Sequence, residues 1–128
     1  MEITLDTHTL IWYVDKGLNG KLSKKALKTI KEAEDAYIIY IPIIVLMETL
    51  HLIEKERVNL SFNKLLLALE ESSNYQIISF DTQVLTIAKT IKGLEVHDRL
   101  ILATALLTES SLVSNDRELH KKSASVIW

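Results

Sequence analysis

The segment ITLDTHTLIWYV, residues 3–14, joins a strand-like run to a helical run, with one acid between them. Glu2–Leu5 is short and rich in apolar residues, which favours a strand, and His8–Val14 is a short candidate helix. Asp6 directly follows the strand. A strand that leads at once into a helix is the repeating unit of α/β proteins, so this segment predicts an α/β fold.

The same alternation continues along the rest of the chain. The other strand-like segments are Tyr37–Ile41, Gln76–Ser79, Ser111–Ser114 and Ala124–Ile127. The helical patterns are residues 22–33, with Ser23 near the start, then Val45–Glu56, Ser61–Glu71, Thr82–Lys92 and Asp98–Leu107. Within the last of these, residues 100–107 (LILATALL) are apolar nearly all round, which predicts a helix buried against the sheet. We therefore expect a mainly parallel central sheet flanked by helices.

Composition limits the kinds of protein that this chain can be. A length of 128 residues, with no linker, repeat or low-complexity tract, predicts one domain over residues 1–128. The absence of cysteine excludes disulfides, thiolate metal sites and cysteine nucleophiles. No secretory signal is visible, and the longest apolar run, Tyr37–Met47, is broken by Pro42 and is too short to span a bilayer. We expect a cytoplasmic protein without a membrane segment.

Four acids stand where strands end or where the following helices begin. Asp6 and Asp116 follow strands, Asp98 opens the apolar helix, and Glu48 lies about one turn into the helix after the second strand. Ligands of open parallel sheets bind beyond the carboxyl ends of the strands, so these acids could meet at one rim. Clustered carboxylates repel one another unless a cation is present, and Mg²⁺ or Mn²⁺ prefers such oxygen ligands. The formal net charge of −2 gives no overall attraction to nucleic acid, so a phosphate substrate would need metal ions or a local basic surface.

Each acid also has an ordinary structural interpretation. Asp6 and Asp98 could cap helices, and Asp116 could be a turn residue. Glu48 is explained least well in this way, because it interrupts an apolar context. Asp81 also follows a strand, but a helix begins beside it, and we interpret it as an N-cap outside the site.

The sequence around these acids resembles a known family. LDTHTLIW (residues 5–12) looks like the opening box of PIN-domain ribonucleases, in particular the VapC-type toxins of toxin–antitoxin pairs. LMET (46–49), HDRLILATA (97–105) and SNDREL (114–119) resemble the family's later acidic boxes, and VIW (126–128) is similar to its last strand. One box would be a weak match, but these occur in the right order over nearly the whole chain.

The resemblance implies a Rossmann-like PIN fold and a Mg²⁺- or Mn²⁺-dependent endoribonuclease that cleaves RNA phosphodiesters with metal-activated water. On this interpretation Asp6, Glu48, Asp98 and Asp116 hold the metal directly or through water. Thr7 and Ser114 hydroxyls could hydrogen-bond these acids or the metal's waters, and Arg99 and Arg117 could hold RNA phosphates or pair structurally with acids. One departure is that the family often has an Asp-Pro shortly before its third acid, where this chain has Glu95-Val96-His97.

Other basic residues have plainer interpretations. His8 or His97 could serve as a general base, but packing or hydrogen bonding at a helix start is favoured, because metal-activated water already supplies the nucleophile. A stripe formed by Lys21, Lys24 or Lys25, Lys28 and Lys31 is more typical of a solvated helix face than of a phosphate site.

Alternatives within and outside this family remain. A toxin implies an antitoxin partner, one expected to insert a segment near the acidic groove, and PIN-like domains commonly form homodimers. The same site logic would serve a housekeeping RNA-processing nuclease. A different class is a PIN-like module that binds RNA or protein without cutting. A dehalogenase-like phosphatase fits poorly, because it would need a second Asp where His8 stands.

Overall fold

The centre of the molecule is a five-stranded sheet with the strand order β3-β2-β1-β4-β5, in a computed structural model that describes residues 1–128. All four strand pairs are parallel. The strands are β1 (Ile3–Leu5), β2 (Ile39–Pro42), β3 (Tyr75–Ile78), β4 (Ser111–Val113) and β5 (Val126–Ile127). This confirms the predicted α/β class, and every expected strand is present to within two residues at each end.

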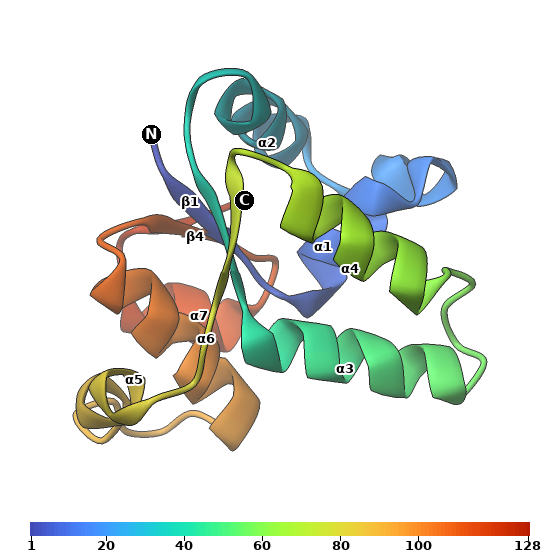
Figure 1. Ribbon diagram of the computed structural model, residues 1–128. Coiled ribbons are helices and arrows are strands. Elements are labelled where there is room, and N and C mark those ends of the chain that lie inside the picture. The colour runs from blue at the N-terminus through green and yellow to red at the C-terminus, as the bar shows by residue number, and fades with distance from the viewer.

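Helices cover both faces of the sheet. They are α1 (Thr7–Val14), the 3₁₀ helix η1 (Lys16–Lys21), α2 (Lys24–Ala36), α3 (Ile43–Glu54), α4 (Phe62–Glu71), α5 (Thr82–Ala88), α6 (Val96–Leu107) and α7 (Arg117–Lys122). Figure 1 shows α5, α6 and α7 on one side of the strands and α1, α3 and α4 on the other. The chain therefore winds in one direction from β1 to β3, crosses the sheet, and winds in the other direction from β4 to β5.

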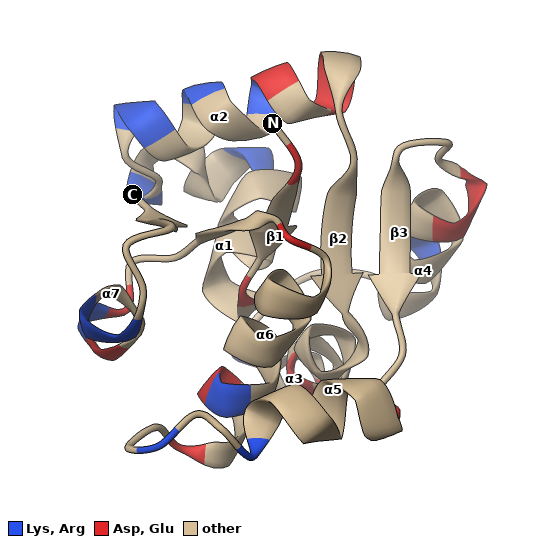
Figure 2. Cartoon of the chain, turned by 90° about the vertical axis from the view of Figure 1, so that its left-hand side faces the viewer, with Lys and Arg blue, Asp and Glu red and all other residues tan.

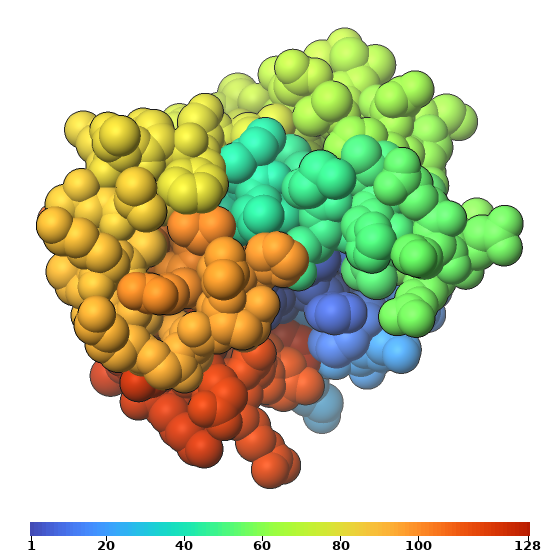
Figure 3. Space-filling model, turned by 90° about the horizontal axis from the view of Figure 1, so that it is seen from below, coloured from blue at the N-terminus to red at the C-terminus, as the bar shows by residue number.

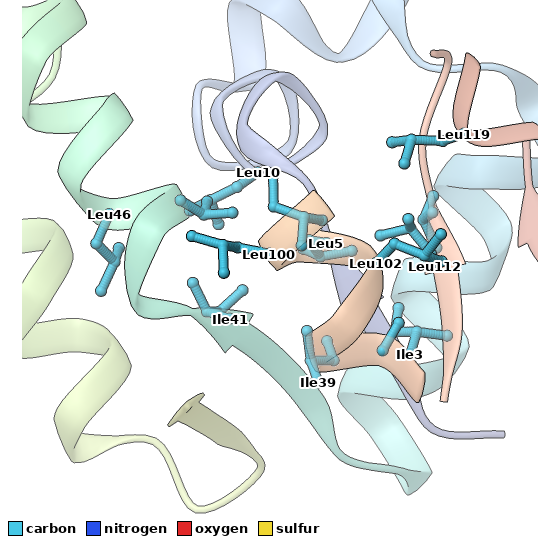
Figure 4. Packing of buried hydrophobic residues seen from close by; sticks show 14 of the residues in the cluster. Ile3, Leu5, Leu10, Ile39, Ile41, Leu46, Leu100, Leu102, Leu112 and Leu119 are labelled. Atoms are coloured by element: carbon cyan, nitrogen blue, oxygen red, sulfur yellow. The ribbon is translucent and has the colours of Figure 1, made fainter. Parts of the chain in front are cut away.

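Burial explains why these segments form these elements. All residues of β1 and β2 are buried, as expected for strands covered on both faces. Figure 4 shows Leu100 and Leu102 of α6 near Leu5 and Leu112 of the sheet, within a cluster of 24 buried residues. The apolar segment predicted to be a buried helix is one, since the residues from Leu100 to Ala105 are all buried.

Several element ends differ from the sequence predictions. The fifth helix was expected over Thr82–Lys92 and ends at Ala88, and η1 and α7 were not predicted at all. Both missed elements are short and polar, so they lack the apolar stripe by which a helix is recognised in a sequence. Asp98 does not cap α6, because Glu95 is the N-cap and Asp98 lies in the first turn. No helix combines the length and apolarity needed to cross a membrane.

Candidate functional site

A cavity of about 400 Å³ lies at the edge of the sheet where the parallel strands end. Its lining residues are Asp6, Thr7, His8, Thr9, Trp12, Glu48, Asp98, Ile101, Asn115 and Asp116. Figure 3 looks onto this end and shows a hollow where α1 (blue), α3 (green), α6 (orange) and the C-terminal segment (red) meet. All four predicted acids line this one cavity, although they are distributed over most of the chain.

The topology explains why the cavity is here. The chain leaves β1 toward β2, whereas β4 lies on the other side of β1, so the winding direction changes between β1 and β4. At such a switch point, the connections leave in opposite directions and open a crevice beyond the strands. Asp6 follows β1 and Asp116 lies three residues beyond β4, so one acid stands on each side of the crevice.

Asp6 is held by hydrogen bonds on both carboxylate oxygens. It is the N-cap of α1, with Thr9 N donating to Oδ1 at 3.1 Å, and Ser114 Oγ donates to Oδ2. Burial raises the pKa of Asp6 above its ordinary value, and the hydrogen bonds from Ser114 and Thr9 oppose this. The expected capping role is therefore real, and it coexists with a place in the cavity wall.

Ser114 connects Asp6 to Asp116. Its side chain is completely buried, and Oγ accepts a hydrogen bond from Asp116 N at 3.0 Å while donating to Asp6. Its carbonyl oxygen lies 2.7 Å from Nε2 of His120, which anchors the same turn to α7. This arrangement fixes the two acids relative to each other across the crevice.

Asp116 is the N-cap of α7. Its Oδ1 accepts from Glu118 N at 2.8 Å and from Leu119 N at 3.4 Å. Both backbone hydrogen bonds go to Oδ1, so the cap uses only one oxygen of the carboxylate. Like Asp6, this residue both starts a helix and lines the cavity.

Asp98 carries the clearest electrostatic signature of the site. Its pKa is raised from 3.8 to about 7, mainly by burial, then by the negative charges of Asp116 and Glu95, by a hydrogen bond to Asp116, and by Glu48. Burial is the largest cause, and Asp116 and Glu48 contribute because they line the same cavity as Asp98.

Each carboxylate oxygen of Glu48 contacts a side chain from a different helix. Thr7 Oγ1 donates to Glu48 Oε1 at 2.6 Å, and His97 Nδ1 lies 3.1 Å from Oε2. Thr7 belongs to α1 and His97 to α6, so the carboxylate from α3 contacts both neighbouring helices. Thr7 and Ser114, singled out in the sequence, thus lie in hydrogen-bond contact with two of the four acids.

The donor set suits a hard divalent cation. Carboxylate oxygens are the ligands that Mg²⁺ and Mn²⁺ prefer, and a bound cation would favour the charged form of Asp98, whose pKa is raised by burial and then by neighbouring acids. The four acids line one cavity, but no three acids or histidines lie close enough together to hold one ion directly. Mg²⁺ usually keeps several waters, so a spaced set of acids fits an ion held partly through water.

The predicted phosphate contacts are not part of this cavity. Arg99 Nε donates to the carbonyl oxygen of Ala88 at 2.9 Å, which ties α6 to the end of α5. Arg117 is exposed at the start of α7. Neither side chain lines the acidic cavity.

The lysine stripe lies mainly elsewhere. Figures 1 and 2 show α2 at the opposite end of the molecule from α3 and α5, and Figure 2 shows its basic segments in blue. Lys28 pairs with Glu32 on the same helix at 3.9 Å. Lys21, just before α2, differs because its Nζ lies 5.7 Å from the ring centroid of Trp12, a residue of the cavity wall.

Sequence reasoning did not assign the contacts of three residues at this edge. Glu95 caps α6, His97 contacts Glu48, and His120 contacts the carbonyl of Ser114. The signal available for Glu95 was its place three residues before Asp98, the spacing of an N-cap to the third residue of its helix. The His97–Glu48 contact joins helices that are distant in sequence, so no local pattern could reveal it. The His120 contact spans only six residues, but it depends on the shape of the turn between β4 and α7.

Comparison with known proteins places this geometry in context. The family model described as PIN domain matches residues 3–124. A solved structure of VapBC2 from Rickettsia felis bound to a DNA fragment from their promoter shares 21% identity, with a TM-score of 0.71 over 99% of this chain and 96% of that chain. A toxin–antitoxin complex from Klebsiella pneumoniae shares 20% identity, with a TM-score of 0.67 over 98% and 96%.

A third similar structure is PAE2754 from Pyrobaculum aerophilum, at 17% identity and a TM-score of 0.57, covering 99% of this chain and 88% of that chain. At these identities the structural likenesses speak for the fold. A search of curated proteins found no match to this chain.

Proposed function

The chain belongs to the PIN-domain family, and from that premise we propose that it is a Mg²⁺- or Mn²⁺-dependent endoribonuclease, the toxin of a toxin–antitoxin pair. The observation that carries the proposal is the convergence of Asp6, Glu48, Asp98 and Asp116 on one cavity at the switch point of the sheet. A binding surface for RNA alone would gain nothing from four acids, because RNA is itself negatively charged.

The proposed chemistry divides between a bound ion and the chain. A divalent ion supplies activation of the attacking water and offsets the negative charge of the phosphodiester. Asp6, Glu48, Asp98 and Asp116 would hold it, directly or through water. Thr7 and Ser114 fix the orientation of Glu48 and Asp6, as their hydrogen bonds require.

Hydrolysis by water needs no covalent enzyme intermediate. The chain has no cysteine, and the Ser114 hydroxyl is completely buried and donates to Asp6, which leaves it unsuited to attack a substrate. We expect in-line attack on phosphorus, with a 5′-phosphate and a 3′-hydroxyl as the products. RNA is the proposed substrate, and the cytoplasm is the compartment we propose for the reaction.

The toxin assignment adds a protein partner. Two of the similar structures are VapBC2 and a toxin–antitoxin complex, and this chain covers at least 96% of each matched chain. We propose that a neighbouring small protein binds near the acidic cavity and blocks it. Growth arrest on expression, relieved by that partner, would separate a toxin from a housekeeping RNA-processing nuclease.

We also propose a homodimer. Large apolar side chains are exposed on one part of the surface, namely Ile43, Met47, Phe80, Leu85 and Val96, each between 41% and 66% exposed. Phe80 links Ile43 to Leu85 and Val96, because it shares one hollow with Ile43 and another with the other two. Met47 lies one helical turn after Ile43 on α3. A contiguous apolar surface of this kind is where a second copy would bury area.

The test is cleavage of a mixed RNA pool by the wild type and by Asp98→Asn, each with Mg²⁺, Mn²⁺ or EDTA. We expect the wild type to cut only with metal and the variant not to cut. Intact RNA in every metal, with the protein folded, would contradict the nuclease and favour the module that binds without cutting. Cutting that persists in EDTA would contradict the metal dependence.

A further inference from the structure

His97 makes a contact that the proposed chemistry has not used. It is the second residue of α6, directly before Asp98, and its side chain is 47% exposed. Nδ1 lies 3.1 Å from Glu48 Oε2, well inside hydrogen-bond distance, whereas Glu95 Oε2 is 4.0 Å away. The closer of its two acidic contacts is therefore the one to Glu48 of α3, and Glu95, two residues before it in the chain, is farther away.

This contact completes the restraint of Glu48. Oε1 of the carboxylate accepts a hydrogen bond from Thr7 of α1, and Oε2 lies within ion-pair distance of Nδ1 of His97 of α6. A carboxylate contacted at one oxygen can still swing about its last side-chain bond, but contacts at both oxygens restrict that rotation. The lone pairs of Glu48 that remain free are consequently set in direction before any ligand arrives.

The contact also fixes a distance between two acids. Glu48 and Asp98 come from different helices, and their mutual repulsion contributes to the raised pKa of Asp98. Repulsion alone would push α3 and the first turn of α6 apart at this edge. The His97 bridge joins the residue beside Asp98 to Glu48 itself, so it holds these two carboxylates on one side of the cavity.

We propose that His97 is a positioning residue, whose Nδ1 contact with Glu48 orients this carboxylate and sets its separation from Asp98 for a divalent cation. The proposal rests on the proposed function, since it concerns the same acids. It assigns His97 no proton transfer, and it needs only a donor at Nδ1. His97 directly precedes Asp98, so the first turn of α6 carries both the contact to Glu48 and an acid of the cavity wall.

The experiment compares three variants with the wild type. His97→Ala removes the donor. His97→Asn restores it, because the Asn side-chain nitrogen is attached to Cγ, as Nδ1 is in histidine. His51→Ala, on the exposed surface of α3 one turn beyond Glu48, is the matched control for losing a histidine. Mn²⁺ affinity is measured by titration calorimetry, and RNA cleavage is measured on the same preparations.

We expect His97→Ala to weaken Mn²⁺ binding ~10–100-fold, the usual effect of losing a group that orients a ligand. His97→Asn should stay within several-fold of the wild type, and His51→Ala should equal it. Equal Mn²⁺ affinity in His97→Ala and the wild type would overturn the proposal. So would equal losses in His97→Ala and His97→Asn, because the donor would then not be what matters.

The wild type separates this inference from the proposed function. A wild type that binds no Mn²⁺ and cuts no RNA contradicts the nuclease itself. A further readout needs no metal: in metal-free protein, the His97 ring nitrogen signals in ¹⁵N NMR should report a hydrogen on Nδ1, and Glu48→Gln should shift them. A wild type that binds Mn²⁺ and cuts RNA, with His97 signals unmoved by Glu48→Gln, would contradict the His97 bridge alone.

Discussion

Replacing Asp98 with Asn should make the metal-free protein more stable at neutral and alkaline pH. The pKa of this carboxyl is about 7 in the folded protein, against an ordinary value of 3.8. The folded state thus holds its proton more tightly than the unfolded chain does. Between about pH 4 and pH 7 the unfolded chain has already ionised this group while the folded protein has not, so stability falls as the pH rises through that window.

The structure sets the size of this effect. A difference of about 3 pKa units corresponds to an upper bound of about 4 kcal/mol, at 1.36 kcal/mol for each unit. Asp98 is only half-buried, so solvent screens much of this, and we expect a net destabilisation of ~1–2 kcal/mol above pH 7. Asn has the same shape and no charge, so the variant should recover that amount.

The assay is urea unfolding of the wild type and Asp98→Asn, in EDTA, at pH 4 and pH 8. The variant should exceed the wild type by ~1–2 kcal/mol at pH 8 and by much less at pH 4, where the folded wild-type carboxyl is neutral and the unfolded one is only about half ionised. Adding Mg²⁺ at pH 8 should stabilise the wild type and leave the variant nearly unchanged. A stability gain of equal size at both pH values would refute the reasoning, because it could not come from the charge.

Other consequences of the site can be tested independently. Asp116→Asn should abolish cleavage yet keep the α7 cap, whereas Asp116→Ala should also lose ~1 kcal/mol of stability in urea unfolding, since Asn is as good an N-cap as Asp and Ala is a poor one. Asp6→Asn should likewise abolish cleavage with the fold intact by circular dichroism. Ser114→Ala should slow cleavage ~10–100-fold, in single-turnover rates, through the loss of its bond to Asp6. Phe80→Glu should convert a dimer to a monomer in light scattering, whereas Leu67→Glu, equally exposed but on α4, should not.

The fold was largely predictable because its signals are local. Short apolar runs between amphipathic helices mark β1 to β5, and the burial of the segment around Leu102 follows from its lack of a polar face. What the sequence could not provide were short polar elements such as α7 (Arg117–Lys122). These form because a cap and a neighbouring strand hold them, not because of a periodic pattern.

The candidate site was predictable in part for a different reason. The carboxyl ends of parallel strands share one edge, so it is enough to know that Asp6 and Asp116 follow strands to expect them at the same edge. The contacts that orient them are not encoded by position along one element. The contacts of Thr7 and His97 with Glu48 depend on how α1, α3 and α6 pack. No local sequence pattern specifies that packing.

A helix cap and a site residue are not alternative roles, because Asp6 and Asp116 have both. At the carboxyl edge of a parallel sheet, a strand runs almost directly into a helix, whose first N–H groups face the same crevice as the ligand. An acid at that junction can use one oxygen for the cap and leave the other at the crevice, as Asp116 does with Oδ1 bound to α7. The cap then orients the carboxylate, so the structural role supports the chemical one. Glu48 lies within α3 and has no such cap, which is why its orientation depends on Thr7 and His97 instead.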